Sequence, residues 1–447
     1  MKLWNRHKSC TTLQIESRFA TGCLIEFLPE SVFIVAPGKP VCYLAAIIQK
    51  QEQRNHDMRL LDMKRRTFIS SAAKATMLAV PALMFRNLAW AAQSVYSRMM
   101  QMRTYNGIRD LSELPYFEST SGGRLRMIVE GLEGGIDGHT HLCLNALAGG
   151  EPDLMKLHPR TRYYLPPDIK SSLDVYINQN AGAEDKKKMT SVIIGSLTPG
   201  GSDVTDTHTI PNLIEEMDRL KIEKAVVLPV RMGIPIGDNM TERYMQAVRS
   251  SGQEDRFILC GGIEPTLDDA LEKIETYKQE GLRGIKLHPN FGRFYPNDKK
   301  AWPAYELCGK YDLPVLIHSG RTGFKERKTL GFKLYTEDYS DIANFEEPIA
   351  AFPDTRFVLC HSGAMQNEQA IKIAKNNKNV WMDIHGQGVA NIQTMIRELG
   401  PERLMYGSDW AFYPEAIMVA RLLLATEQDK TARRMIFRDN ARRFWKL

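Results

Sequence analysis

The chain has 447 residues, of which 43% are hydrophobic and 25% are charged, a composition typical of a soluble globular protein rather than a disordered or fibrous one. The net charge of +6 is small for this length and the basic residues are dispersed, so nothing indicates a nucleic-acid partner. Seven cysteines without a regular spacing argue against a disulfide framework.

The N-terminal part of the chain changes character at residue 63. Residues 1–62 hold apolar patches without a clear period or any chemically active group. In residues 63–91 a basic start, a weakly apolar stretch and the small-residue pattern Ala89-Trp90-Ala91 follow one another, which is typical of a secretory signal peptide. Paired arginines followed by Phe68 are typical of the signal that the twin-arginine export machinery reads.

Signals of this kind stand at the start of a chain. We therefore expect Met63 to be the initiator and residues 1–62 to be a mis-called or disordered extension. The protein would be exported to the periplasm in a folded state. An amphipathic helix or a single membrane anchor is the alternative reading, but the apolar stretch is shorter than the roughly 20 residues that a span needs, so we expect no stable span.

Residues 92–135 form a polar lead-in, with one short strand expected at 124–129. From residue 136 onward, continuous apolar runs alternate with helical patterns. Such runs are typical of strands that are covered on both faces. The runs end at the following residues: His141, Pro229, Gly262, His288, His318, His361, His385 and Asp409.

Eight such strands, with helical stretches between them and a closing helix at 414–426, predict a TIM (β/α)8 barrel of the α/β class over residues 136–447. One connection differs from the others. Residues 142–208, after the first strand, are too many for an ordinary loop. We expect this insertion to be a lid over the site, with a helix of its own at 169–180.

Histidines gather where the predicted strands end, which is where barrels of this kind carry their working residues. His139 and His141 lie two residues apart in the first strand, so both imidazoles face the same side and can reach one metal ion. Six of the ten histidines of the chain occupy strand ends, which scattered core histidines would not do.

Five short motifs, in this order, resemble the amidohydrolase superfamily. Within it, they are similar to the amidohydrolase-related branch of metal-dependent hydrolases and aminocarboxymuconate-semialdehyde-type decarboxylases. The resemblance covers roughly residues 136–447. The motifs are Asp137-Gly138-His139-Thr140-His141, Gly284-Ile285-Lys286-Leu287-His288-Pro289, Ile317-His318, His361-Ser362-Gly363 and Gly407-Ser408-Asp409-Trp410.

The resemblance implies one divalent metal ion, held by His139, His141, His318 and Asp409. Zinc suits such a ligand set best, with manganese or iron as alternatives. His361 would be the catalytic histidine, and Asp409 would take a proton from the metal-activated water. His361 would also stabilise the developing oxyanion or orient the substrate carbonyl.

Other strand-end residues have open roles. Lys286 could bridge two metal ions in a binuclear site, a less favoured arrangement. His288 and His385 could contact the substrate or support the ligands, or be structural. Arg293 and Arg321 follow the fourth and fifth strands and could bind a substrate carboxylate, or be ordinary surface charge.

The leading hypothesis is a metal-dependent hydrolase that uses a metal-activated water on an amide, ester or lactone of a small, carboxylate-bearing molecule. A non-oxidative decarboxylase of the same branch is the alternative, since both activities share every ligand. A catalytically inactive exported binding barrel is a second alternative, which the intact ligand set argues against. The small-molecule substrate and the export machinery are the expected partners, and homo-oligomer formation stays open.

Overall fold

The computed structural model describes residues 98–144, 152–196, 202–233, 238–324 and 336–447 in full, and the backbone of four further strands. The chain divides into two compact units, residues 1–89 and 90–447. In the first unit, β1 (Leu24–Leu28) pairs antiparallel with β2 (Ser31–Val35). The remainder of the expected N-terminal extension and the whole expected signal segment, residues 63–91, lie outside the described residues.

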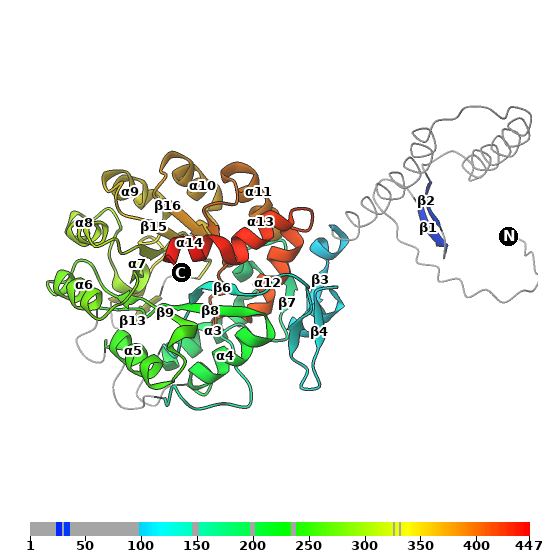
Figure 1. Ribbon diagram of the computed structural model, residues 1–447, viewed down its shortest axis with the longest axis horizontal. Coiled ribbons are helices and arrows are strands. Elements are labelled where there is room, and N and C mark those ends of the chain that lie inside the picture. Colours follow the sequence, from blue (N-terminus) through cyan, green and yellow to red (C-terminus); the bar gives the residue numbers. More distant parts are fainter. Residues whose placement is uncertain are drawn as a thin grey trace, which may run out of the picture. The chain divides into compact units, whose positions relative to one another are not determined.

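The second unit is built around a closed barrel of parallel strands (Figure 1). One sheet orders its strands β6-β8-β9 and a second orders them β10-β11-β12-β15-β16-β17. The third strand position is shared by both sheets, because β9 pairs with β8 while β10, one residue further on, pairs with β11. The strands are β6 (Gly135–Thr140), β8 (Ile222–Val227), β9 (Phe257–Leu259), β10 (Gly261–Gly262), β11 (Ile285–Leu287), β12 (Val315–His318), β15 (Phe357–Cys360), β16 (Val380–Asp383) and β17 (Leu404–Met405).

The ring closes between its first and last strands. Gly138 N donates to the Tyr406 carbonyl at 2.9 Å, and Asp409 N donates to the His139 carbonyl at 2.8 Å. A parallel bridge joins Thr140 to Trp410. The predicted (β/α)8 barrel is therefore confirmed, and its closure places the first-strand histidines beside Asp409.

Helices surround the barrel, as Figure 1 shows. Outside the insertion after the first strand, helices lie between the barrel strands as expected, and one of them, α5, was not among the stretches expected from the sequence. Its buried residues Met240, Tyr244 and Val248 recur at four-residue spacing, so the helical pattern was present in the sequence. The helices are α4 (Ile210–Arg219), α5 (Met240–Ser250), α6 (Ala270–Gln279), α8 (Trp302–Lys310), α9 (Glu346–Ala351), α10 (Asn367–Asn376), α11 (Val389–Leu399) and α12 (Glu415–Ala425). Among the described helices, none has both the length and the apolar character to cross a membrane.

The lead-in and the insertion after β6 are joined by a small sheet. In the lead-in, β4 (Phe117–Ser119) pairs with β5 (Leu125–Met127), so the short strand expected at 124–129 is confirmed.

The helix expected at 169–180 is wrong. That segment contains β7 (Lys170–Ser172), whose backbone pairs with β3 (Thr104–Asn106) of the lead-in, and long-range pairing of this kind leaves no local signal.

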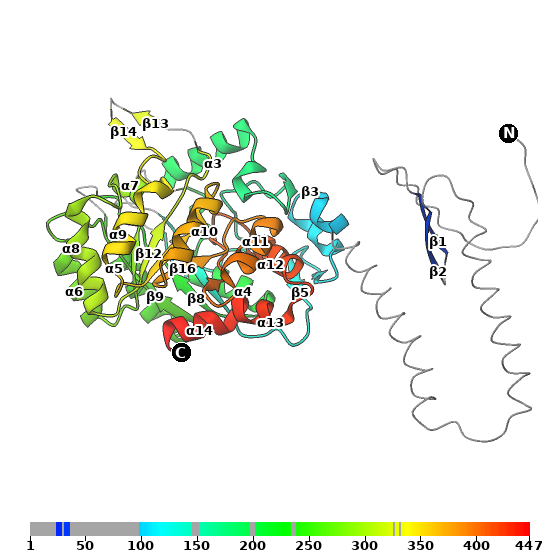
Figure 2. The same ribbon diagram turned by 90° about the horizontal axis from the view of Figure 1, so that it is seen from above.

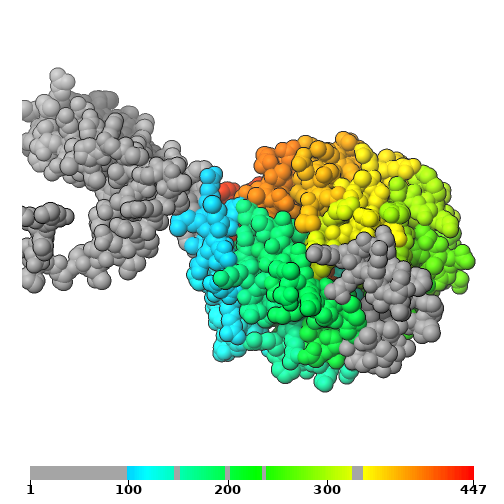
Figure 3. Space-filling view, turned by 180° about the vertical axis from the view of Figure 1, so that it is seen from behind, coloured from blue at the N-terminus to red at the C-terminus, as the bar shows by residue number. Residues whose placement is uncertain are grey.

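The insertion has its helix further along the chain, at α3 (Ala183–Ser196). Figure 2 shows α3 near the hairpin of β13 (Arg327–Thr329) and β14 (Phe332–Tyr335), on one side of the barrel, with the C-terminal helices on the opposite side. In Figure 3, the insertion in green lies next to the yellow and orange segments of the second half of the barrel. Its role as a lid remains a prediction.

The barrel interior is divided along its axis. Leu316 and His318 lie on the same face of β12, and Val358 and Cys360 on the same face of β15, because side chains two apart in a strand share a face. Toward the N-terminal ends of the strands, here called the lower end, these positions are apolar and pack with Trp445 of α14 (Asn440–Trp445). Toward the C-terminal ends of the strands, the upper end, they carry polar groups.

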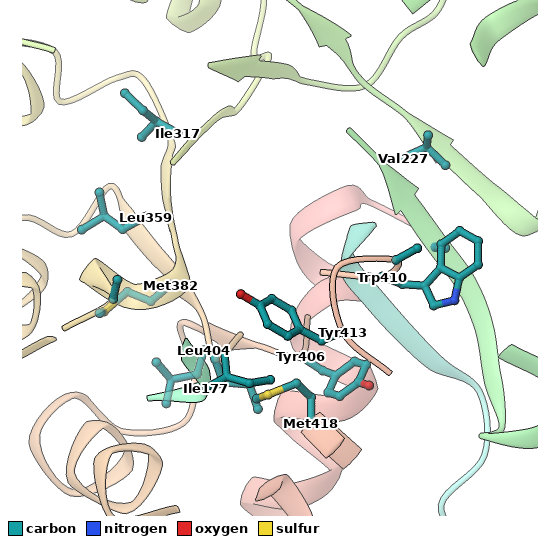
Figure 4. Packing of buried hydrophobic residues seen from close by; sticks show 14 of the residues in the cluster. Ile177, Val227, Ile317, Leu359, Met382, Leu404, Tyr406, Trp410, Tyr413 and Met418 are labelled. Carbon is teal, nitrogen blue, oxygen red and sulfur yellow. The ribbon is translucent and has the colours of Figure 1, made fainter. Parts of the chain in front are cut away.

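The outer face of the sheet packs against the helices. Ile317, Leu359 and Met382 are register partners on neighbouring strands and lie side by side in the main hydrophobic cluster (Figure 4). This dry packing on both sides of each strand holds the strand ends rigidly, which a site built from several strands requires.

Candidate metal centre

The upper end of the barrel collects the candidate residues. Each of them is at most 8% exposed, although they come from six of the strand positions or the residues just after them. Burial of so many ionisable side chains at one place is typical of a functional site. They are His139, His141, Lys286, His288, His318, His361, His385 and Asp409.

His139 of β6 and His141, which directly follows this strand, each donate their ring hydrogen to a group on the side away from the site. His139 Nδ1 donates to Asp383 Oδ2 at 2.8 Å, and His141 Nδ1 donates to the Leu228 carbonyl at 2.6 Å. A carboxylate and a carbonyl can only accept, so each Nδ1 carries the hydrogen and each Nε2 presents a lone pair. The two Nε2 atoms lie 3.2 Å apart.

Asp409 adds a third acceptor to this pair. Its Oδ1 lies 3.1 Å from His141 Nε2 and 3.7 Å from His139 Nε2, and it has no hydrogen-bond partner. Three acceptor atoms this close repel one another unless a cation lies among them. Lys286 Nζ lies 3.3 Å from His139 Nε2, but Asp409 Oδ1 has no hydrogen-bond partner. Ligand atoms about 2.0–2.1 Å from a tetrahedral zinc ion are about 3.3 Å apart, so the observed spacing fits a divalent ion.

Further unpartnered atoms surround the same point. Among the described residues, His318 Nε2, His361 Nδ1 and His385 Nε2 are buried without a hydrogen-bond partner. Buried polar atoms are nearly always satisfied, so an ion or ordered water normally completes such a group. Ligand-capable atoms of His139, His361 and Asp409 all lie within 4.8 Å of one another.

The pKa values of this group favour metal-binding forms. Burial, followed by the charge of Lys286, lowers the pKa of His139 to about 4. Burial also holds the pKa of His318 and of His361 well below the usual range, so their imidazoles are neutral. Burial alone would raise the pKa of Asp409, but the facing histidines, His385 first, outweigh it and keep the carboxyl ionised.

Asp383, at the end of β16, organises the histidines and was not singled out from the sequence. Besides accepting from His139 Nδ1, it accepts from His361 N at 2.8 Å and from His385 N at 3.2 Å. The signal that could have found it is an acidic residue inside the apolar run 380–384. Burial opposes its ionisation, but His139 lowers its pKa below the ordinary value.

Asp137 performs a similar task on β6. Its Oδ1 accepts from His139 N and from Ser408 N, both at 3.0 Å, and so ties the first strand to the segment that carries Asp409. Burial raises the pKa of Asp137 to about 6, although the hydrogen bonds from Ser408 oppose this.

A cavity of about 190 Å³ opens above these groups. Its floor contains histidines and Asp409, and its walls are mainly apolar. The insertion contributes through α3, which supplies Thr190, Ile193 and Ile194. The other main apolar and aromatic lining residues are Leu144, Tyr176, Val230, Met232, Phe291, Phe324, Phe412 and Tyr413.

Comparison with known proteins gives one decisive match. The family model described as amidohydrolase matches residues 136–447, which is more than half of the chain. The chain belongs to the amidohydrolase family. No curated protein matches this chain.

Several solved structures are similar to this chain at low sequence identity. An uncharacterised TIM-barrel protein from Bordetella bronchiseptica is 16% identical, with 64% of this chain and 96% of that chain covered and a TM-score of 0.45. The 5-carboxyvanillate decarboxylase from Sphingomonas paucimobilis is 18% identical, with 52% and 82% covered and a TM-score of 0.42. The 2,6-dihydroxybenzoate decarboxylase from Rhizobium is 15% identical, with 70% and 99% covered and a TM-score of 0.45.

Lys286 and His288, whose roles the sequence left open, both lie at the site. Lys286 Nζ lies 3.3 Å from His139 Nε2 and 3.5 Å from Cys360 Sγ, on the site floor. His288 stacks on His318, with ring centres 4.1 Å apart, and lines the cavity.

Arg293 lines the cavity, but Arg321 does not. The Arg321 guanidinium pairs with Asp338 at 3.1 Å and with Asp341 at 2.8 Å at the surface. Of these two arginines, Arg293 is therefore the one placed to meet a substrate, because local acidic residues hold Arg321 at the surface.

We predict that Asp383→Asn weakens metal binding by about 10- to 100-fold, the usual cost of losing a partner that orients a ligating histidine. The amide keeps the shape of the side chain but removes the charge that fixes the His139 tautomer. Competition with a chelator of known affinity measures the change.

The matched control for this substitution is Asp341→Asn, which alters a carboxylate outside the cavity lining. Equal metal affinity in Asp383→Asn and the wild type would contradict the role given to Asp383.

Proposed function

We propose that this protein is a metal-dependent hydrolase of a small molecule with an amide, ester or lactone bond and a carboxylate group. The observation that carries the proposal is the convergence of acceptor atoms of His139, His141 and Asp409 on the cavity floor. A divalent ion held there supplies Lewis acidity, which polarises a carbonyl and lowers the pKa of water.

The chain's own groups supply proton handling. Asp409 is ionised and buried at the cavity floor, so it can accept a proton from an attacking water. His361 lines the cavity with a neutral ring whose Nδ1 has no partner, and its backbone is fixed by Asp383. It is suited to orient the substrate carbonyl and to hold a proton next to it.

The cavity supports a substrate with an apolar body and one anionic group. Apart from Lys286 on the floor, Arg293 is the cationic side chain among the described lining residues. Its Nη2 lies 3.3 Å from the Gly233 carbonyl, which holds the guanidinium at the cavity wall. Aromatic rings such as Phe291 and Phe412 would enclose the apolar body.

We propose a single ion, with zinc favoured over manganese or iron because imidazole nitrogens outnumber carboxylate oxygens. Lys286 would join the ligand set only in a binuclear site. The ion's identity and number follow from elemental analysis.

A non-oxidative decarboxylase is the second candidate, and the apolar lining favours it. A carboxylate moved from water into apolar surroundings is destabilised relative to neutral carbon dioxide. The same walls and the same floor would serve this reaction.

Assays of the purified protein on carboxylate-bearing amides, esters and lactones test the leading proposal. We predict base consumption in a pH-stat for esters and lactones, and release of an amine for amides, in each case without carbon dioxide release. His361→Ala should lower kcat by about 10²- to 10⁴-fold, the usual contribution of a proton-transfer group, with the metal retained.

Arg321→Gln is the control for this assay, because the Arg321 side chain lies outside the cavity lining. Carbon dioxide release without hydrolysis would establish the second candidate instead. An unchanged kcat in His361→Ala would remove that residue from the mechanism.

We also propose export through the twin-arginine pathway, on the strength of the sequence pattern in residues 63–91. N-terminal sequencing of the exported protein should give a start just after this segment. An exported protein that retains residues 1–62 would contradict the proposal.

A further inference from the structure

His385, at the end of the seventh strand, has no assigned role in the mechanism above. Its side chain is completely buried and is not part of the cavity lining. It therefore does not contact a substrate in the cavity. Its ring centre lies 4.7 Å from that of His361 and 5.6 Å from that of His139, so it belongs to the same cluster of imidazoles.

The His385 ring donates its hydrogen to a carbonyl outside the cluster of imidazoles. Nδ1 lies 3.0 Å from the Ser408 carbonyl, which can only accept, so Nδ1 is the donor. Nε2 then presents a lone pair. It lies 3.2 Å from Asp409 Oδ2, is buried, and makes no hydrogen bond. This is the arrangement found for His139 and His141.

Hydrogen bonds hold the backbone around His385, and the bond from Nδ1 to the Ser408 carbonyl orients the ring. His385 N donates to Asp383, and the carbonyl of Gly386 accepts from Arg421 Nη1 at 2.7 Å and from Ile177 N at 2.9 Å. Arg421 is itself fully buried. The facing pair of Nε2 and Oδ2 is thus built into the fold.

The ring spacings fit attachment to one ion. An imidazole bound through nitrogen has its centre about 3.1 Å from zinc, so two such rings lie about 4.4 to 5.7 Å apart for angles of about 90° to 135°. His139 and His141 are 5.1 Å apart by this measure. The distance from His385 to His139, 5.6 Å, falls in the same interval.

We propose that His385 Nε2 is a further ligand of the ion held by His139, His141 and Asp409. The inference rests on the proposed metal site and adds a ligand from the seventh strand, which the motifs of the sequence did not include. The Asp409 carboxylate lies between the ligands, with Oδ1 facing the histidines of β6 and Oδ2 facing His385.

The test compares His385→Asn with His385→Gln in the full chain loaded with zinc. Asparagine can keep the contact to Ser408 but does not reach Asp409, whereas the glutamine nitrogen reaches as far as Nε2 but is an amide, a poor ligand. Both variants should bind zinc about 10- to 100-fold more weakly in chelator competition. X-ray absorption should show one fewer imidazole around the ion in both.

His208→Gln is the matched control, because His208 is also a buried histidine but donates to the Arg162 carbonyl instead of facing Asp409. It should keep the wild-type affinity and imidazole count. An unchanged imidazole count in folded His385→Gln or His385→Asn would overturn the inference, even if affinity fell. Wild-type protein that binds no metal would instead overturn the proposed function.

Discussion

The site depends on a cluster of hydrogen-bond acceptor atoms on imidazole rings, because the ring hydrogens are donated to other groups. His139 and His141 each give their ring hydrogen to a carboxylate or carbonyl behind them, and their lone pairs face Asp409 at short range. Such an arrangement is repulsive by itself, and removing charged and polar groups from water adds to the cost. A bound divalent ion converts that repulsion into coordination, which is why this constraint points to a metal site.

The barrel makes this arrangement possible because its apolar packing and its polar site groups lie at opposite ends of the interior. The lower interior is apolar and is packed by the C-terminal helix, so the strands are held rigidly. The upper strand ends can then carry groups that would not assemble in a flexible loop. Closure of β6 against the segment after β17 brings together His139 and Asp409, which are far apart in sequence. The backbone N of Asp409 donates to the His139 carbonyl.

Much of the fold could be predicted from the sequence, because buried parallel strands leave continuous apolar runs. The strands, the closing helix and the extra length after the first strand all appear in the structure, although several strands end earlier than expected, as β17 does at Met405 instead of Asp409. The helix expected at 169–180 failed because pairing of β7 with β3 depends on residues more than 60 positions away. Of the two roles left open for Arg321, the structure favours ordinary surface charge, and the acidic partners that hold it there became visible only in three dimensions.

The site was predictable in its histidines and Asp409, which recur at strand ends, but its supporting groups were not. Asp383 looks like one acidic residue in an apolar run, and only the fold shows that it holds three neighbours. The direction in which each imidazole donates was also hidden. Those tautomers come from backbone carbonyls such as that of Leu228, which carry no sequence signal.

The metal content of the purified full-length protein, measured by elemental analysis beside His141→Ala, tests the central claim most directly. The account predicts about one equivalent of a divalent transition metal in the wild type and its loss in a folded variant. A folded wild-type protein without metal, after exposure to zinc, manganese and iron, would contradict the account.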